Sequence, residues 1–136
     1  MVGNVANGAI HDVQVSAFPF AGFDLTNAPI GDFQAWSRQG AIALTGRFDD
    51  DKLDDIVLIP TSLSPYWTTL PVAFSNGDGG FRVTNTGVTT FPAAARQMPR
   101  LVAKGRFDKN GRDDLIMLGG EGWTTVPVAL SNGDGS

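Results

Sequence analysis

Apolar and polar residues alternate in short stretches that occur twice along the chain and predict β-strands. In the longer copy, alternation covers residues 41–48, 68–75 and 81–85, and a continuous apolar run covers residues 55–60. Alternation is typical of strands with one buried face, and a short apolar run of a strand buried on both faces. We therefore expect four antiparallel strands in each unit, with the second strand the most buried.

Two blocks of sequence recur at nearly the same spacing. Residues 67–80 read WTTLPVAFSNGDGG, and eleven of these fourteen positions are identical in WTTVPVALSNGDGS at residues 123–136. Residues 46–59 read GRFDDDKLDDIVLI and return as GRFDKNGRDDLIML at residues 105–118. The spacings are 56 and 59 residues, because the connector at 60–66 shortens to 119–122. Such a period is typical of stacked supersecondary units that cannot bury their apolar faces alone.

The segments between the strands carry turn signals. NGDG at residues 76–79 and 132–135 predicts hairpin turns, each with at least one residue at positive φ. Pro71 and Pro127 fall inside the third strand of each unit, where we expect an edge-facing or bulged position. Residues 13–27 read as a hairpin whose second arm, FDLTN at 23–27, matches FRVTN at 81–85.

Composition excludes several classes of function. The chain is 42% apolar, yet no stretch approaches the roughly 18 apolar residues of a membrane span, so we expect no membrane insertion. A net charge of −4 argues against nucleic-acid binding, and the absence of cysteine excludes disulfides and zinc–thiolate sites. Seventeen glycines and eight prolines indicate turns and short strands rather than helices. Residues 1–22, an N-terminal segment with a possible strand, show no signal-peptide pattern.

The layout of acidic loop, aliphatic strand and Ser-Asn-Gly-Asp-Gly turn resembles the FG-GAP (VCBS-type) blade of integrin-α-like β-propellers, and is similar to that of propeller lectins. The resemblance covers residues 23–136. It implies an all-β fold of four-stranded propeller blades, with two circularly permuted blades in the chain, the second lacking its fourth strand. It also implies a protein that works outside the cytoplasm, extracellular or at the cell surface.

Loops of this family resemble a calcium site with carboxylates at positions 1, 3, 5 and 9. The matching residues here are Asp49, Asp51 and Asp55 in one copy and Asp108, Asn110 and Asp114 in the other. Position 1 is Arg47 or Arg106, and a guanidinium about 4 Å from a divalent ion repels it by roughly 8 kcal/mol at an effective dielectric near 20. We therefore expect no metal or other cofactor, with Arg47 bridging to Asp55 and Arg106 to Asp114. An unpaired acidic turn and a calcium site remain the alternatives.

Strand parity places the acidic loops and the NGDG turns at one face of the array and the remaining connectors at the other. That second face collects all three tryptophans of the chain together with a tyrosine and arginines. Aromatic rings beside arginines suit stacking on a sugar and hydrogen-bonding of its hydroxyls. The candidate sugar-binding residues are Trp36, Arg38, Tyr66, Trp67, Arg96 and Trp123. The alternative is that Trp67 and Trp123 only cap the gap between adjacent blades.

No residues point to catalysis. The only histidine, His11, lies outside the repeat, and no nucleophile motif or phosphate-binding loop is present. The sequence therefore favours a non-enzymatic, lectin-like module that holds a glycan between blades. The alternatives are a structural or adhesive propeller segment that binds protein partners, and a remnant attached to a hydrolase.

Two blades are too few to close a propeller ring. Residues 23–27 are expected to form a fourth strand that belongs to neither complete blade, and the second blade lacks its fourth strand. Each chain is therefore expected to lend this strand to a neighbour. Copies would then assemble head-to-tail into a closed homo-oligomer, about three chains for six blades. The other account is that the sequence is part of a longer single-chain propeller.

Overall fold

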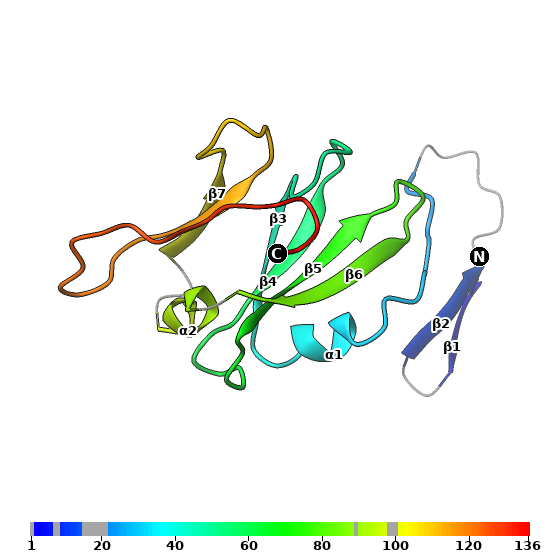
Figure 1. The fold of residues 1–136 in the computed structure, drawn as a ribbon. Helices are drawn as coiled ribbons and strands as arrows, with labels where there is room; N and C mark the ends of the chain where they lie inside the picture. Colours follow the sequence, from blue (N-terminus) through cyan, green and yellow to red (C-terminus); the bar gives the residue numbers. More distant parts are fainter. Residues whose placement is uncertain (1, 7–8, 15–21, 89, 98–100) are drawn as a thin grey trace.

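The computed structural model describes residues 2–6, 9–14, 22–88, 90–97 and 101–136. It is mostly β, with antiparallel sheets and two short helices (Figure 1). Near the N-terminus, β1 (Val2–Ala6) and β2 (Ala9–Gln14) form a two-stranded antiparallel sheet, where the sequence indicated only a possible strand.

The first repeat folds as a four-stranded antiparallel sheet in sequence order, as its sequence pattern predicts. Its strands are β3 (Ile42–Gly46), β4 (Asp55–Ile59), β5 (Thr69–Ser75) and β6 (Phe81–Gly87). The two inner strands, β4 and β5, carry most of the buried side chains, because neighbouring strands cover their edges and packed elements cover their faces. The acidic loop joins β3 to β4 at one end of this sheet, and the β4–β5 connector lies at the other (Figure 1).

The second repeat forms a three-stranded antiparallel sheet. Its strands are β7 (Val102–Gly105), β8 (Asp114–Met117) and the short β9 (Val128–Ala129). β7 pairs with β8 in the register that β3 and β4 use, with Gly105 opposite Asp114 as Gly46 is opposite Asp55. Within the described residues no fourth strand pairs with β9.

The NGDG turns adopt the predicted backbone. Gly77 and Gly79 have φ values of 82° and 87°, and Gly133 and Gly135 have 86° and 91°. Glycine enters this region without the steric cost that a Cβ imposes. The sequence prediction of positive φ in both turns is therefore confirmed.

Pro71 lies in an inner strand, so of the two expected positions, edge-facing or bulged, the edge-facing one is wrong. It is opposite Asn85 of β6, and its other side faces β4. The β4–β5 pairing covers only Ile56–Val57 against Val72–Ala73, so this ladder stops beside Pro71. A residue without an N–H is tolerated there because no ladder bond is required of it.

Two one-turn helices precede the two sheets, where the sequence indicated turns rather than helices. They are α1 (Phe33–Ser37) and α2 (Phe91–Ala95), and each begins with a buried phenylalanine. Pro92 lies in the first turn of α2, where its missing N–H costs no helical bond. Neither described helix is long or apolar enough to cross a membrane.

Residues 22–30 are not a strand, so the predicted second arm of a hairpin at 23–27 is wrong for the single chain. The first residues of the predicted first arm, Val13 and Gln14, belong to β2 and pair with β1, and residues 15–21 lie outside the described residues. A strand needs a partner for its backbone N–H and C=O groups, and no described strand pairs with residues 23–27.

The main core lies between the two repeats. It joins the side of the first sheet that carries Val57, Leu70 and Phe74 to the side of the second sheet that carries Leu115 and Met117. Helix α2 closes this core with Phe91 and Ala95. A second, smaller cluster covers the opposite side of the first sheet, around Phe33, Leu58 and Ala73. The two sheets are therefore stacked face to face.

Candidate functional site

Two of the predicted sugar-binding residues are partly packed into the fold. Trp36 and Trp67 both lie against the cluster of Phe33, Leu58 and Ala73 and are half-buried. The indole Nε1–H of Trp67 donates to the side-chain oxygen of Gln39 at 3.3 Å. This hydrogen bond fixes the indole ring and satisfies its one polar group. The packing supports the alternative in which Trp67 caps the sheet, while leaving part of its ring accessible.

Tyr66 and Arg96 form an aromatic–cation pair at the seam between the repeats. Arg96, which follows α2, donates from Nε to the carbonyl of Thr61 at 3.3 Å and from Nη2 to that of Ser64 at 3.0 Å. Its guanidinium carbon lies 5.5 Å from the centroid of the Tyr66 ring. Tyr66 is nevertheless 69% exposed. Arg96 thus connects the second repeat to the β4–β5 connector and supports an open ring.

The β4–β5 connector itself is held by a local network. The Thr61 N–H donates to Ser64 Oγ at 3.0 Å, and the Ser64 N–H donates to the Thr61 carbonyl at 3.0 Å. The Thr61 hydroxyl donates to the carbonyl of Gly40 at 2.6 Å. Gly40 has φ of 79°, and a Cβ there would lie 2.7 Å from that of Leu63. The connector that presents Tyr66 is therefore preorganised by contacts that require glycine at position 40.

The remaining two predicted residues lie elsewhere. Arg38 follows α1 and is exposed, and Trp123 belongs to the connector of the second repeat. Trp123 lies over Gly120, where any Cβ would overlap its indole, and is 38% exposed. The structure thus pairs Tyr66 with Arg96 at the β4–β5 connector, and packs Trp36 and Trp67 against one cluster of the first sheet.

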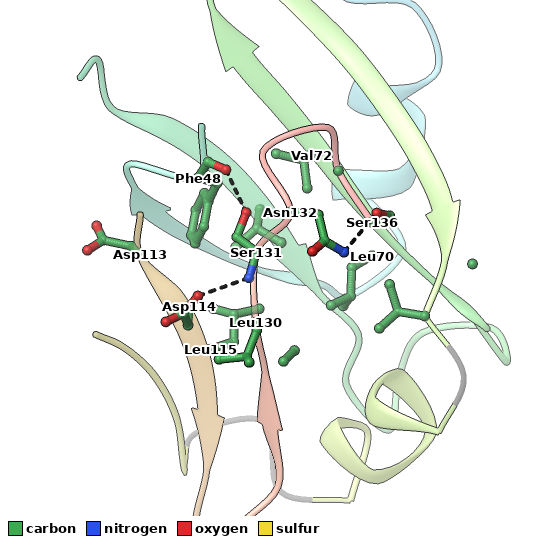
Figure 2. Close-up of a pocket in the computed structure, with 15 residues that line it drawn as sticks. Phe48, Leu70, Val72, Asp113, Asp114, Leu115, Leu130, Ser131, Asn132 and Ser136 are labelled. Carbon is green, nitrogen blue, oxygen red and sulfur yellow. Dashed lines mark hydrogen bonds between the residues drawn. The ribbon is translucent and has the colours of Figure 1, made fainter. Parts of the chain in front are cut away.

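A cavity of about 340 Å³ lies between the two sheets (Figure 2). Its walls are apolar, from Phe48, Val72 and Leu115 among others, and Asp113 and Ser131 lie at its polar rim. Its volume falls in the range of small-molecule sites. None of its lining residues is among the predicted sugar-binding residues. Alternation along strands marked these positions as core, and only the packing of the two sheets shows that a space remains between them.

The buried aspartates cap strands rather than pairing with arginine. Asp55 accepts the N–H of Phe48 at 2.8 Å and of Ser75 at 3.0 Å, and Asp114 accepts those of Phe107 and Ser131 at 2.8 and 2.9 Å. The predicted bridges to Asp55 and Asp114 are therefore wrong. Arg47 Nε instead lies 3.7 Å from Asp54, and Arg106 Nε lies 3.6 Å from Asp113. Backbone donors already occupy the buried carboxylates, so the guanidinium groups stay at the surface.

The first acidic loop concentrates negative charge. Asp49, Asp51 and Asp55 each bring one oxygen within 4.8 Å of the others. Burial raises the pKa of Asp55 despite its two N–H donors, with Asp49 and Asp51 adding to the rise, and burial likewise raises the pKa of Asp49. Carboxylate oxygens are ligands that calcium prefers, so the expectation of a metal-free loop stays a prediction.

The second acidic loop closes on itself. The Asn110 amide donates to Asp108 at 2.8 Å and to the carbonyl of Ser131 at 3.1 Å, and its oxygen accepts the N–H of Arg112. An amide donor directed at Asp108 satisfies the carboxylate that a cation would otherwise use. The two loops therefore differ in chemistry although their sequences align.

The acidic loops also hold the two sheets together, a role that the sequence analysis missed. Asp113 accepts the N–H of Arg47 at 2.9 Å and its own N–H donates to the Arg47 carbonyl at 2.7 Å. The Ser131 hydroxyl donates to the carbonyl of Phe48 at 2.6 Å (Figure 2). Arg112 donates to Asp50 at 2.9 Å. The repeated Asp-Asp pair was the available signal. Its second residue caps a strand in both copies, and its first residue in the second copy, Asp113, binds across the repeats.

Replacing Asp113 with asparagine should lower stability in a pH-dependent way. Burial alone would raise the pKa of Asp113, but the N–H of Arg47, Lys104 and Arg106 together hold it below its ordinary value of 3.8. A lowered pKa contributes stability above the ordinary value, which is lost as the pH falls through the lowered one.

We expect Asp113→Asn to cost about 1–2 kcal/mol at pH 7, and the cost to shrink below pH 3.8. Urea unfolding at pH 7, 5 and 3 measures it. The matched control is Asp54→Asn, measured at low chain concentration, because the side chain of Asp54 is largely exposed in the single chain. A cost that stays constant down to pH 3 would contradict this assignment.

In comparisons with known proteins, no family model, no curated protein and no solved structure matches the chain.

Proposed function

We propose that this protein is a non-enzymatic carbohydrate-binding module in which each repeat is a blade of a propeller-like array. The glycan binds at the connector end of the seam between repeats. Tyr66 supplies the stacking face, Arg96 supports the ring from the next repeat, and Trp67 follows Tyr66 in the same connector. This is the arrangement that propeller lectins would require, with the ligand between blades.

The observation that carries the proposal is the fixed but open ring of Tyr66. An exposed aromatic side chain normally loses rotamer freedom when it binds a ligand, which weakens binding. Here Arg96 lies 5.5 Å from the ring centroid and is itself anchored on two carbonyls. The ring is thus preorganised before a ligand arrives. A planar, amphipathic face beside hydrogen-bonding groups suits a sugar ring, which has both apolar C–H and polar hydroxyl surfaces.

The assignment of the repeats as blades rests on how they pack. The first repeat is a four-stranded antiparallel sheet in sequence order, and the second sheet stacks face to face on it across a shared apolar core. The same loop, strand and turn occur in both repeats. Radial stacking of such units is the architecture of a propeller.

A structural or adhesive role is the second candidate, and the environment of Trp67 favours it. Trp67 is half-buried against Leu58 and Ala73, and its Nε1–H is already bonded to Gln39. A tryptophan held in this way stabilises the end of a sheet without any ligand. In that case the protein would bind protein partners, and Tyr66 would be one exposed residue of a contact surface.

We expect simple sugars or glycans to quench the tryptophan fluorescence, with a glycan array identifying the sugars to titrate. For a sugar that binds, Tyr66→Ala should weaken affinity at least about tenfold, equivalent to about 1.4 kcal/mol. Leu63→Ala is the matched control, because Leu63 is exposed in the same connector. A chain that responds to no sugar, or a Tyr66→Ala variant that binds as tightly as the unmodified chain, would refute the carbohydrate proposal.

A further inference from the structure

The two sheets contact each other through non-equivalent faces. We call the side of a sheet that faces the following repeat its trailing face, and the side that faces the preceding repeat its leading face. In the first sheet the trailing face carries Phe48, Val57, Ile59, Leu70, Val72 and Phe74, all between 0 and 6% exposed. They pack on the leading face of the second sheet, which carries Val102, Leu115 and Met117.

The trailing face of the second sheet has the same side chains but no cover. The positions equivalent to Phe48, Ile59, Leu70, Val72 and Phe74 are Phe107, Leu118, Val126, Val128 and Leu130. These five are 40 to 52% exposed. They form one apolar face in the fold, built by the alternation that buries their counterparts. The second sheet therefore presents an uncovered apolar face that corresponds to the face of the first sheet buried in the main core.

The leading face of the first sheet is only partly covered. Leu58, equivalent to Met117, is already buried against Phe33, whereas Ala43 is exposed although the equivalent Val102 is buried in the inter-repeat core. Among the described residues, the polar contacts that Asp113 and Ser131 make across the repeats are also missing on this face. Asp54 occupies the position of Asp113, but its side chain is 69% exposed, and its ion pair lies within its own sheet. Ser75 accepts the N–H of Gly77, as Ser131 accepts that of Gly133, but no carbonyl in the described part of the chain accepts its proton.

Residues 23–27 already lie where the fourth strand of a preceding repeat belongs. The turn glycine Gly135 packs against Thr84 of β6, so closely that any Cβ would displace the threonine. Gly79 packs in the same way against Thr26, the equivalent residue of FDLTN. Phe23 and Leu25 are exposed beside it. This segment thus lies where the fourth strand of a preceding sheet would lie. No described part of the chain supplies the other three strands of that sheet.

We propose that the leading face of the first sheet docks onto the trailing face of the second sheet of another copy of this chain. The internal contact between repeats is then reproduced between chains. Asp54 binds the backbone of Arg106 as Asp113 binds that of Arg47, and Ser75 donates to the Phe107 carbonyl. Continuity with the internal interface fixes both the occupant and its orientation, which is heterologous and head-to-tail.

The same docking gives residues 23–27 a partner strand. In the first sheet, Phe81 is opposite Ser75 and Val83 is opposite Ala73. The equivalent register places Phe23 opposite Ser131 and Leu25 opposite Ala129 of the other copy, which completes a four-stranded sheet. It also brings Arg38 of one chain to the connector of the other that carries Trp123. The proposal does not depend on carbohydrate binding, because it rests on the packing of the sheets alone.

The test uses two variants that each disable one face, and light scattering that reports mass. Ala43→Arg places a charge on the leading face, and Leu130→Glu places one on the trailing face. Both positions are exposed in the single chain, so each variant should fold, which circular dichroism checks. Leu63→Glu is the control, since Leu63 is exposed in a connector and lies on neither face.

We expect the unmodified chain and Leu63→Glu to form oligomers larger than dimers, and each face variant alone to be a monomer. An equimolar mixture of Ala43→Arg and Leu130→Glu should form a dimer and nothing larger, because one intact interface remains. A monomeric unmodified chain would overturn the proposal. So would face variants that keep the oligomer, or a mixture that stays monomeric.

Discussion

Asp55→Ala is expected to lower the free energy of unfolding by about 3–5 kcal/mol, because two backbone donors lose a charged acceptor. Asp55 is fully buried, and its two oxygens separately accept the N–H groups of Phe48 and Ser75. These donors lie at the end of β3 and of β5, so their loss disturbs three neighbouring strands. A buried N–H without an acceptor bears its full desolvation cost.

Asparagine should not rescue this site. Its amide has one acceptor oxygen, and its NH₂ group would face one of the two N–H donors. We therefore expect Asp55→Asn to remain well below the unmodified chain in a chemical unfolding experiment at pH 7. Asp51→Ala is the control, since Asp51 is exposed in the same loop. A loss for Asp55→Ala no larger than that for Asp51→Ala would show that the carboxylate is not a strand cap.

The stability linked to the titration of Asp55 changes with pH in the opposite direction from that linked to Asp113. Burial raises the pKa of Asp55, so the folded chain binds this proton more tightly than the unfolded chain does. The stability linked to its titration therefore decreases as the pH rises through the raised pKa. A carboxyl group nevertheless suits this position, because the strand ends need a side chain that can accept two donors at once.

Phe74→Ala should cost about 3–5 kcal/mol, because it removes a large side chain from a packed core. Phe74 is 2% exposed between the two sheets, and the guanidinium of Arg82 lies 4.2 Å from its ring centroid. Its neighbours are held in paired strands and cannot move far into the vacated space, so most of the cavity left by the ring should persist.

Leu130→Ala is the matched control for Phe74→Ala. Leu130 occupies the equivalent position in the second repeat but is 49% exposed. We expect its replacement to cost less than about 1 kcal/mol when unfolding is followed at low chain concentration, where copies do not dock. Equal losses at the two positions would mean that the second sheet has a covered trailing face in the single chain.

Local sequence was enough to locate the strands and the turn of the first repeat. A strand is indicated by a period of two, as in residues 68–75, or by a short apolar run, as in residues 55–60, and the NGDG turns require residues that accept positive φ. These signals are set within a few residues, so they hold wherever the segment packs. Helices α1 and α2 were missed because one turn of helix has no periodicity to read, and Phe33 and Phe91 define it by packing.

The predicted partners of the arginines failed for a different reason. Arg47 and Asp55 have suitable charges and spacing, but a carboxylate buried at a strand end is reached first by backbone N–H groups that cannot be satisfied elsewhere. The sequence placed all six candidate residues at one face of the array. Only the fold paired Tyr66 with Arg96 and packed Trp36 and Trp67 against a core cluster.

By itself, the sequence determined the repeat, its strands, the conformation of the hairpin turns and the position of the acidic loops. Only the tertiary structure decided which copy of a repeated residue is buried. Phe74 and Leu130, or Asp113 and Asp54, are equivalent in the sequence, yet one of each pair is covered and the other exposed. The physical reason is that burial depends on which surface lies opposite, and in a stacked array that surface belongs to the next unit rather than to the residue's own segment.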